Sequence, residues 1–91
     1  MPDLKIIVDH EAGLHARPLA QFVKVVKSYG ASVQVRNLTS GKGPVNGASP
    51  VNLLLLSVKK GNEIEITADG EQAPEVLVAL KALVESNFGE G

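Results

Sequence analysis

The sequence contains no cysteine and no tryptophan, and aromatic residues make up only 3% of its 91 residues. Without cysteine, the chain forms no disulfide bond and offers no thiolate as a nucleophile or a metal ligand. The shortage of aromatic residues means that the core must be built from valine, leucine, isoleucine and alanine. The absence of cysteine is also consistent with a reducing compartment.

An excess of charge of one sign is lacking as well. Nine Lys and Arg residues face ten Asp and Glu residues, and a net charge of −1 argues against nucleic acid or an anionic membrane as partner. The longest apolar run, residues 53–56, is far too short to span a bilayer. The first residues also lack the basic and apolar regions of a signal peptide, so we expect a cytoplasmic protein.

The hydrophobic periodicity predicts seven elements in one domain, 1–91, in the order β-α-β-β-α-β-α. Alternating apolar residues predict four strands, at 4–8, 32–37, 42–45 and 63–67. Apolar residues at helical spacing predict three helices, at 16–29, 51–56 and 71–87. Few strands with mixed connections favour an α+β two-layer sandwich, in which a largely antiparallel four-stranded sheet carries all helices on one face.

Proline and glycine mark the ends of these elements. Pro44 restricts the third strand to an edge of the sheet, since proline has no N–H for a second neighbour. Ser49 followed by Pro50 is typical of a helix start. Gly30 is placed to end the first helix in a left-handed conformation.

Residues 13–18 read Gly-Leu-His-Ala-Arg-Pro and lie at the junction of the first strand and the first helix. A helix start presents unpaired backbone N–H groups and the positive end of the dipole, a site suited to phosphate. The dipole and Arg17 both disfavour a positive charge on His15, so its neutral imidazole is a competent nucleophile towards phosphorus. The helix start at Ala16 and Arg17, together with the Arg17 guanidinium, would stabilise the incoming negative charge.

This segment, followed by Phe22 and Val23, resembles the active-site motif of the HPr family, the histidine-containing phosphocarriers of the bacterial phosphoenolpyruvate-dependent sugar phosphotransferase system. The resemblance extends over nearly the whole chain, through residues 41–42, 45–46, Ser49, 58–61, 63–64 and the last helix. It implies an open-faced β-sandwich. It also implies a carrier with a covalent phosphohistidine intermediate, rather than a turnover enzyme, without cofactor or metal.

The resemblance further implies that phosphorylated enzyme I, charged by phosphoenolpyruvate, transfers a phosphoryl group to Nδ1 of His15. The group then passes to a histidine of an enzyme IIA domain in sugar uptake, and Arg17 assists the transfer. The short helix would contact both partners through Val51 and Leu54, although either residue could equally belong to the core. Lys24 and Lys27 are either solvated charges or contacts to acidic enzyme I. We expect a monomer.

Ser49 has two interpretations. It is either the cap of the short helix or a site of regulatory phosphorylation by an HPr kinase/phosphorylase, as the resemblance implies. The family has a bulky apolar pair after this serine, whereas this chain has Pro50 and Val51, which favours the cap.

Other classes of function remain as alternatives. A regulatory protein-binding module of the same fold could act through Ser49 and the surface from Val51 to Leu54. An enzyme with a buried pocket is disfavoured by the scarcity of convergent polar residues. A metal site at His10 and His15 lacks a third ligand at a clear spacing. The branch of phosphotransfer that a carrier would serve stays open.

Overall fold

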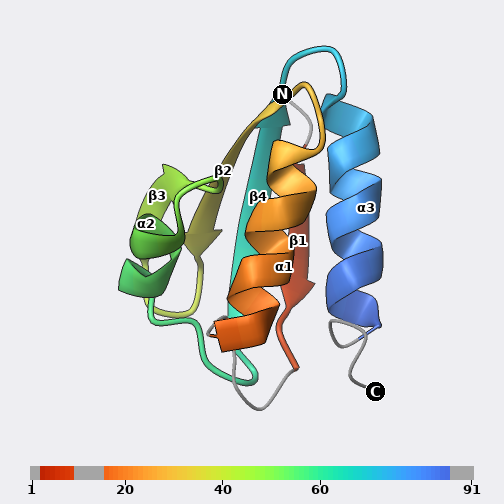
Figure 1. The fold of residues 1–91 in the computed structure, drawn as a ribbon. Coiled ribbons are helices and arrows are strands. Elements are labelled where there is room, and N and C mark those ends of the chain that lie inside the picture. Colours follow the sequence, from red (N-terminus) through yellow and green to blue (C-terminus); the bar gives the residue numbers. More distant parts are fainter. Residues whose placement is uncertain (1–2, 10–15, 87–91) are drawn as a thin grey trace.

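The structure, a computed structural model, describes residues 3–9 and 16–86 (Figure 1). The seven elements occur in the predicted order. They are β1 (Asp3–Ile7), α1 (Ala16–Lys27), β2 (Ser32–Asn37), β3 (Lys42–Asn46), α2 (Pro50–Leu55), β4 (Glu63–Asp69) and α3 (Ala73–Glu85). Within the described residues, no helix is long and apolar enough to cross a membrane.

The four strands form one antiparallel sheet in the order β1-β4-β2-β3. Helices α1 and α3 lie side by side across one face of the sheet, and α2 stands beside β3 (Figure 1). Among the described residues, no helix covers the opposite face (Figure 1). The predicted α+β fold, an open-faced β-sandwich, is therefore confirmed.

The central strands explain how the two faces differ. Strand β4 alternates between core and surface, with Ile64, Ile66 and Ala68 fully buried and the residues between them more exposed. Strand β2 alternates in the same way, as expected for a sheet with one covered face. The largest fully buried side chains are Phe22, Leu53, Leu56, Ile64, Ile66 and Leu80. The core is thus aliphatic apart from Phe22, as the composition predicts.

Strands β1 and β3 are the two edges of the sheet. The edge position predicted for β3 from Pro44 is confirmed, and the pairing of β3 with β2 contains a register shift between Val35 and Asn37. Gly43, next to Pro44, has a φ of 103°, which favours glycine. β3 therefore departs from regular strand geometry at Gly43 and pairs regularly with β2 at Val45 and Asn46.

The prediction that Gly30 ends the first helix in a left-handed conformation is wrong. Helix α1 ends at Lys27, and its last turn is closed by hydrogen bonds from Ser28 N to Val25 O (3.0 Å) and from Tyr29 N to Val26 O (3.4 Å). The φ of Gly30 is not positive. These bonds satisfy the Val25 and Val26 carbonyls without a left-handed residue.

The last helix begins two residues later than predicted, at Ala73 instead of Glu71. The Gln72 side chain accepts a hydrogen bond from Gly30 N, which ties this turn to the end of α1. Residues 71 and 72 therefore form a turn, and the helix starts beside Pro74, which suits a first turn.

Candidate functional site

The segment that contains the predicted nucleophile is described only in part. His10 and His15 lie outside the described residues, as do residues 11–14, so the predictions for both histidines are not tested by the structure. Helix α1 begins at Ala16, directly after His15 in the chain, as predicted from the sequence. Arg17 is the second residue of the helix and is exposed to solvent.

The start of α1 is held in place by the core. Pro18 is buried in the first turn, and Leu19, Phe22, Val23 and Val26 pack into the core along one face. The first turn contains no acidic residue, whereas Lys24 and Lys27 lie in the last turn, where the helix dipole favours positive charge. Arg17 is therefore the one cation placed against the dipole, an arrangement that an anion beside the helix start would stabilise.

On its N-terminal side, this segment follows the end of β1. Val8 is fully buried, its N–H donates to Asn62 O at 2.9 Å, and its carbonyl accepts from Gly61 N at 2.7 Å. The loop between α2 and β4 thus anchors the chain just before the undescribed residues. The two parts of the fold that flank the segment with His15, Val8 and the start of α1, are therefore both held in place by the core.

Helix α2 begins as predicted, with Ser49 as its N-cap. Ser49 is in an extended conformation, and its hydroxyl accepts a hydrogen bond from Asn52 N at 3.3 Å. Its carbonyl accepts from Leu53 N at 3.0 Å, and Pro50 occupies the first turn. The interpretation of Ser49 as a cap is confirmed, while its regulatory phosphorylation stays a prediction.

The exposed residues of α2 form an apolar surface. Val51 is 66% exposed, Leu54 43% and Leu55 64%, whereas Leu53 is fully buried. We call Val51, Leu54 and Leu55 the α2 patch. Val51 and Leu54, for which a core position was equally open, thus lie on the surface. Leu55 was missed, because a run of four leucines at 53–56 does not show which of them face the solvent.

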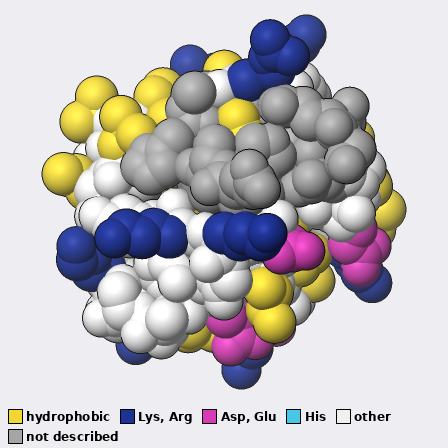
Figure 2. Space-filling view, turned by 90° about the horizontal axis from the view of Figure 1, so that it is seen from below, with side chains coloured by type: hydrophobic (Ala, Val, Ile, Leu, Met, Phe, Trp, Pro, Cys, Tyr) yellow, Lys and Arg dark blue, Asp and Glu magenta, His cyan; other side chains and the backbone are white. Residues whose placement is uncertain are grey.

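The end of the molecule where α1 begins combines apolar and charged surface. Figure 2, which views the molecule from this end, shows hydrophobic side chains gathered on the side where Figure 1 places α2. Lys and Arg side chains, as well as Asp and Glu side chains, lie around the same face. Such a surface suits a protein partner, since apolar contacts supply affinity and charges guide association.

A buried asparagine was also missed by the sequence analysis. Asn37, at the end of β2, is the one buried polar side chain in the described part of the chain. Its Nδ2 donates to Leu56 O at 3.0 Å and to Asn62 Oδ1 at 3.3 Å. Its Oδ1 accepts from Thr39 N at 3.0 Å and Ser40 N at 3.2 Å. The amide therefore has a partner for every bond it can readily make.

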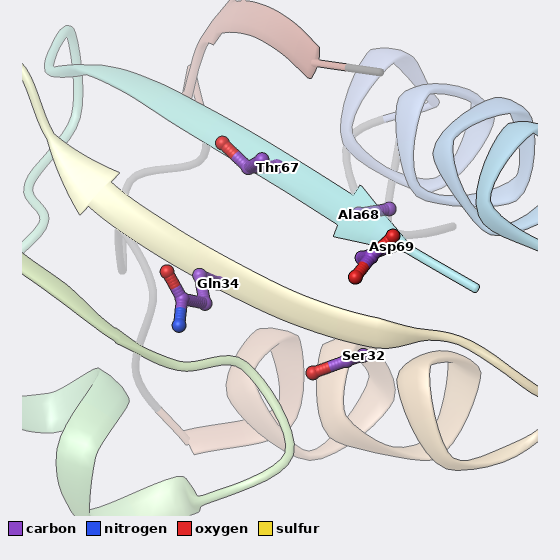
Figure 3. Close-up of a pocket in the computed structure, with 5 residues that line it drawn as sticks. All are labelled: Ser32, Gln34, Thr67, Ala68 and Asp69. Carbon is purple, nitrogen blue, oxygen red and sulfur yellow. The ribbon is translucent and has the colours of Figure 1, made fainter. Parts of the chain in front are cut away.

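Two hollows in the described surface lie away from the start of α1. One, on the open sheet face, is lined by Ser32, Gln34, Thr67, Ala68 and Asp69 (Figure 3). These residues come from adjacent strands, with Ser32 opposite Asp69 and Gln34 opposite Thr67. A second hollow lies between the end of α1 and α3, beside Tyr29 and Val78. None of the predicted site residues lines either hollow.

Metal binding has no support in residues 3–9 and 16–86. This part of the chain contains no group of three or more His, Cys, Asp or Glu residues that could hold a metal ion. A site involving His10 and His15 falls outside the described residues.

Replacing Ser49 with alanine should cost about 1 kcal/mol of stability, because Asn52 N loses its side-chain acceptor. Ser49→Asp should keep the stability, since aspartate caps helices equally well. Urea denaturation of both variants and the wild type measures this. If Ser49→Ala is as stable as the wild type, the cap contributes nothing.

The fold and the surface features together define a class of protein. The described residues form a small open-faced sandwich that exposes Arg17 in the first turn of α1 and the apolar α2 patch on its surface, a combination that suits contact with other proteins. The comparison with known sequences gives the family. Residues 3–86 match the family model described as the PTS HPr component phosphorylation site, and the chain belongs to this family of phosphocarriers of the phosphotransferase system.

Individual relatives agree with this assignment. Phosphocarrier protein HPr of Pseudomonas aeruginosa is 37% identical, over 100% of this chain and 99% of the relative. The multiphosphoryl transfer protein of Salmonella typhimurium is also 37% identical, but the chain spans only 23% of its length. The crystal structure of HPr-C-His from Thermoanaerobacter tengcongensis matches with a TM-score of 0.93 at 33% identity, over 100% of this chain and 99% of that chain.

Proposed function

We propose that this protein accepts a phosphoryl group on His15 from phosphorylated enzyme I and passes it to a histidine of an enzyme IIA domain in sugar uptake. Membership of the HPr family over residues 3–86 carries the proposal. Its physical support is the position of Arg17, an exposed cation in the first turn of α1, immediately after the residue that would be phosphorylated.

The transfer needs little from the carrier beyond a nucleophile and a stabilising charge. The lone pair of His15 Nδ1 forms a bond to phosphorus while the bond from phosphorus to the donor atom of enzyme I breaks, so the phosphoryl group moves without hydrolysis. Free N–H groups at the start of α1 and the Arg17 guanidinium then face the new negative charge. In the second transfer, the enzyme IIA histidine displaces the His15 nitrogen from phosphorus.

The α2 patch is the proposed contact surface for enzyme I and enzyme IIA. Val51, Leu54 and Leu55 are exposed on a six-residue helix that lies near the start of α1. Exposed apolar side chains of this kind supply binding energy when a partner covers them. Lys24 and Lys27 are exposed as well and would meet an acidic partner. The carrier would work in the cytoplasm as a monomer, without metal or cofactor.

A regulatory module of the same fold is the second candidate. It would also use the α2 patch, with Ser49 as a site for an HPr kinase/phosphorylase. The hydroxyl of Ser49 is engaged as the helix cap, and Pro50 follows it. Both features make Ser49 a poor acceptor, because a kinase would have to break the cap and accommodate the rigid proline.

The deciding experiment is phosphoryl transfer. The protein is incubated with phosphoenolpyruvate and enzyme I, and mass spectrometry follows one added phosphoryl group. The sequence has only two histidines, so peptide mapping distinguishes His15 from His10 directly. Transfer from His15 to an enzyme IIA domain supports the carrier. Failure with several sources of enzyme I favours the regulatory module.

Arg17→Ala should slow phosphoryl uptake by about 100-fold, because one charged group that stabilises the transition state is lost. His15 should remain modifiable, since the nucleophile is intact. Lys81→Ala is the matched control, because Lys81 is an exposed cation on α3, outside the proposed contact surface. Rapid-quench measurement of the phosphorylated fraction gives both rates. Equal rates for Arg17→Ala and the wild type would remove Arg17 from the mechanism.

A further inference from the structure

We infer that Asn37 is a positioning residue for phosphoryl transfer. Its buried amide fixes the position of the α2 patch relative to the end of β1, from which the chain continues to His15. This inference rests on the proposed function, since it concerns how one partner contacts the patch and reaches His15 at the same time. Asn37 is fully buried, and neither surface includes it.

The first connection runs to α2. Leu56 is the C-cap of this helix, and its carbonyl accepts a hydrogen bond from Asn37 Nδ2 at 3.0 Å. Final carbonyls of a helix lack intrahelical partners, so an external donor fixes where the helix ends. A helix of six residues has too few hydrogen bonds of its own to hold its position. Asn37 therefore sets the location of Leu54 and Leu55, which immediately precede Leu56.

The second connection runs to β1. Asn37 Nδ2 also donates to Asn62 Oδ1 at 3.3 Å, and Asn62 Oδ1 accepts from Lys59 N at 3.0 Å as well. The backbone carbonyl of Asn62 accepts from Val8 N at 2.9 Å. Val8 is the last buried residue before the segment that carries His15. One amide group thus connects α2, through Asn62, to Val8 at the end of β1, from which the chain continues to His15.

An apolar side chain at position 37 would fill the space without making these bonds. Asn37 follows Val33 and Val35 on the buried face of β2, where the alternation calls for an apolar residue. A buried polar group is costly unless fully paired, but a fully paired one fixes a unique arrangement of the segments it joins. The asparagine therefore specifies the relative positions of α2 and the 59–62 loop, which aliphatic packing alone leaves less sharply defined.

A test uses coupling between Asn37 and the α2 patch. KM for phosphoryl uptake from enzyme I is measured for Leu54→Ala in three backgrounds: wild type, Asn37→Ala and Val33→Ala. Val33 is the matched control, because it is buried on the same strand and makes none of these side-chain bonds. We expect Leu54→Ala to raise KM about tenfold in the wild type and in Val33→Ala, but less than about threefold in Asn37→Ala.

The reduced effect is expected because the α2 patch is already displaced relative to the end of β1 once the Asn37 side chain is lost. Asn62→Ala removes the second connection together with the acceptor of Lys59 N, and it leaves the bond from Asn37 to Leu56 intact. It replaces Asn37→Ala if that variant does not fold, with the same reduced effect expected. A full tenfold effect of Leu54→Ala in the Asn37→Ala or Asn62→Ala background would overturn the inference and leave the proposed function standing. A wild-type protein that takes up no phosphoryl group would instead overturn both.

Discussion

His15→Ala is expected to lower phosphoryl uptake from enzyme I by more than about 1,000-fold, because no other group can take the place of the attacking nitrogen. The fold should be unchanged. The core formed by the described residues closes around Phe22, Leu53, Ile66 and Leu80 without His15. Mass spectrometry after incubation with phosphoenolpyruvate and enzyme I measures uptake, and far-ultraviolet circular dichroism measures the fold.

His10→Ala is the matched control, since His10 is the other of the two histidines of the chain. It should keep normal uptake. Residual phosphorylation of His15→Ala at a serine or at His10 would show that the acceptor has been assigned to the wrong residue. A lost circular dichroism signal would show instead that His15 supports the fold.

The adjacent residues Leu53 and Leu54 should differ in their effects: Leu53→Ala should mainly lower stability, and Leu54→Ala should mainly weaken partner binding. Leu53→Ala should lower the free energy of unfolding by about 2–5 kcal/mol, since a fully buried side chain is removed and a cavity remains. For a chain of this size, the melting temperature should fall by at least about 10 °C. Leu54→Ala should change stability by less than about 0.5 kcal/mol, because Leu54 is 43% exposed.

For partner binding, Leu54→Ala should have the larger effect and Leu53→Ala the smaller one. Leu54→Ala should weaken binding to enzyme I about tenfold, because it removes an apolar contact from the α2 patch. Leu53→Ala, measured at a temperature where it stays folded, should weaken binding less. Titration calorimetry and thermal denaturation together provide the comparison. Equal binding by Leu54→Ala and the wild type would exclude Leu54 from the interface.

The elements of the fold could be predicted because their signals are local. The stripe formed by Leu19, Phe22 and Val26 identifies α1, and alternation at Ile64 and Ile66 identifies β4, since each pattern depends on residues a few positions apart. Ser49 as a cap was predictable for the same reason. The end of α1 was not, because glycine at position 30 only permits a left-handed conformation, while the backbone bonds at Ser28 and Tyr29 decide where the helix stops.

The role of Asn37 could not be predicted, because its partners lie far away in the sequence. Asn37 reads as an ordinary polar residue at a strand end, but its donors reach Leu56 and Asn62, which are 19 and 25 residues further along the chain. Only the strand order brings these segments together. The exposure of Leu55 escaped prediction on similar grounds, since tertiary packing alone selects which leucines of α2 are covered.

The irregular edge strand β3 has a consequence for colloidal behaviour. An exposed edge can recruit a strand from another molecule and start fibril growth. Pro44 removes an N–H from this edge, Lys42 adds charge, and Gly43 interrupts the extended backbone. On the other edge, β1 places Lys5 at the centre of a five-residue strand. The molecule should therefore resist aggregation at high concentration, and its two edge strands would provide that resistance.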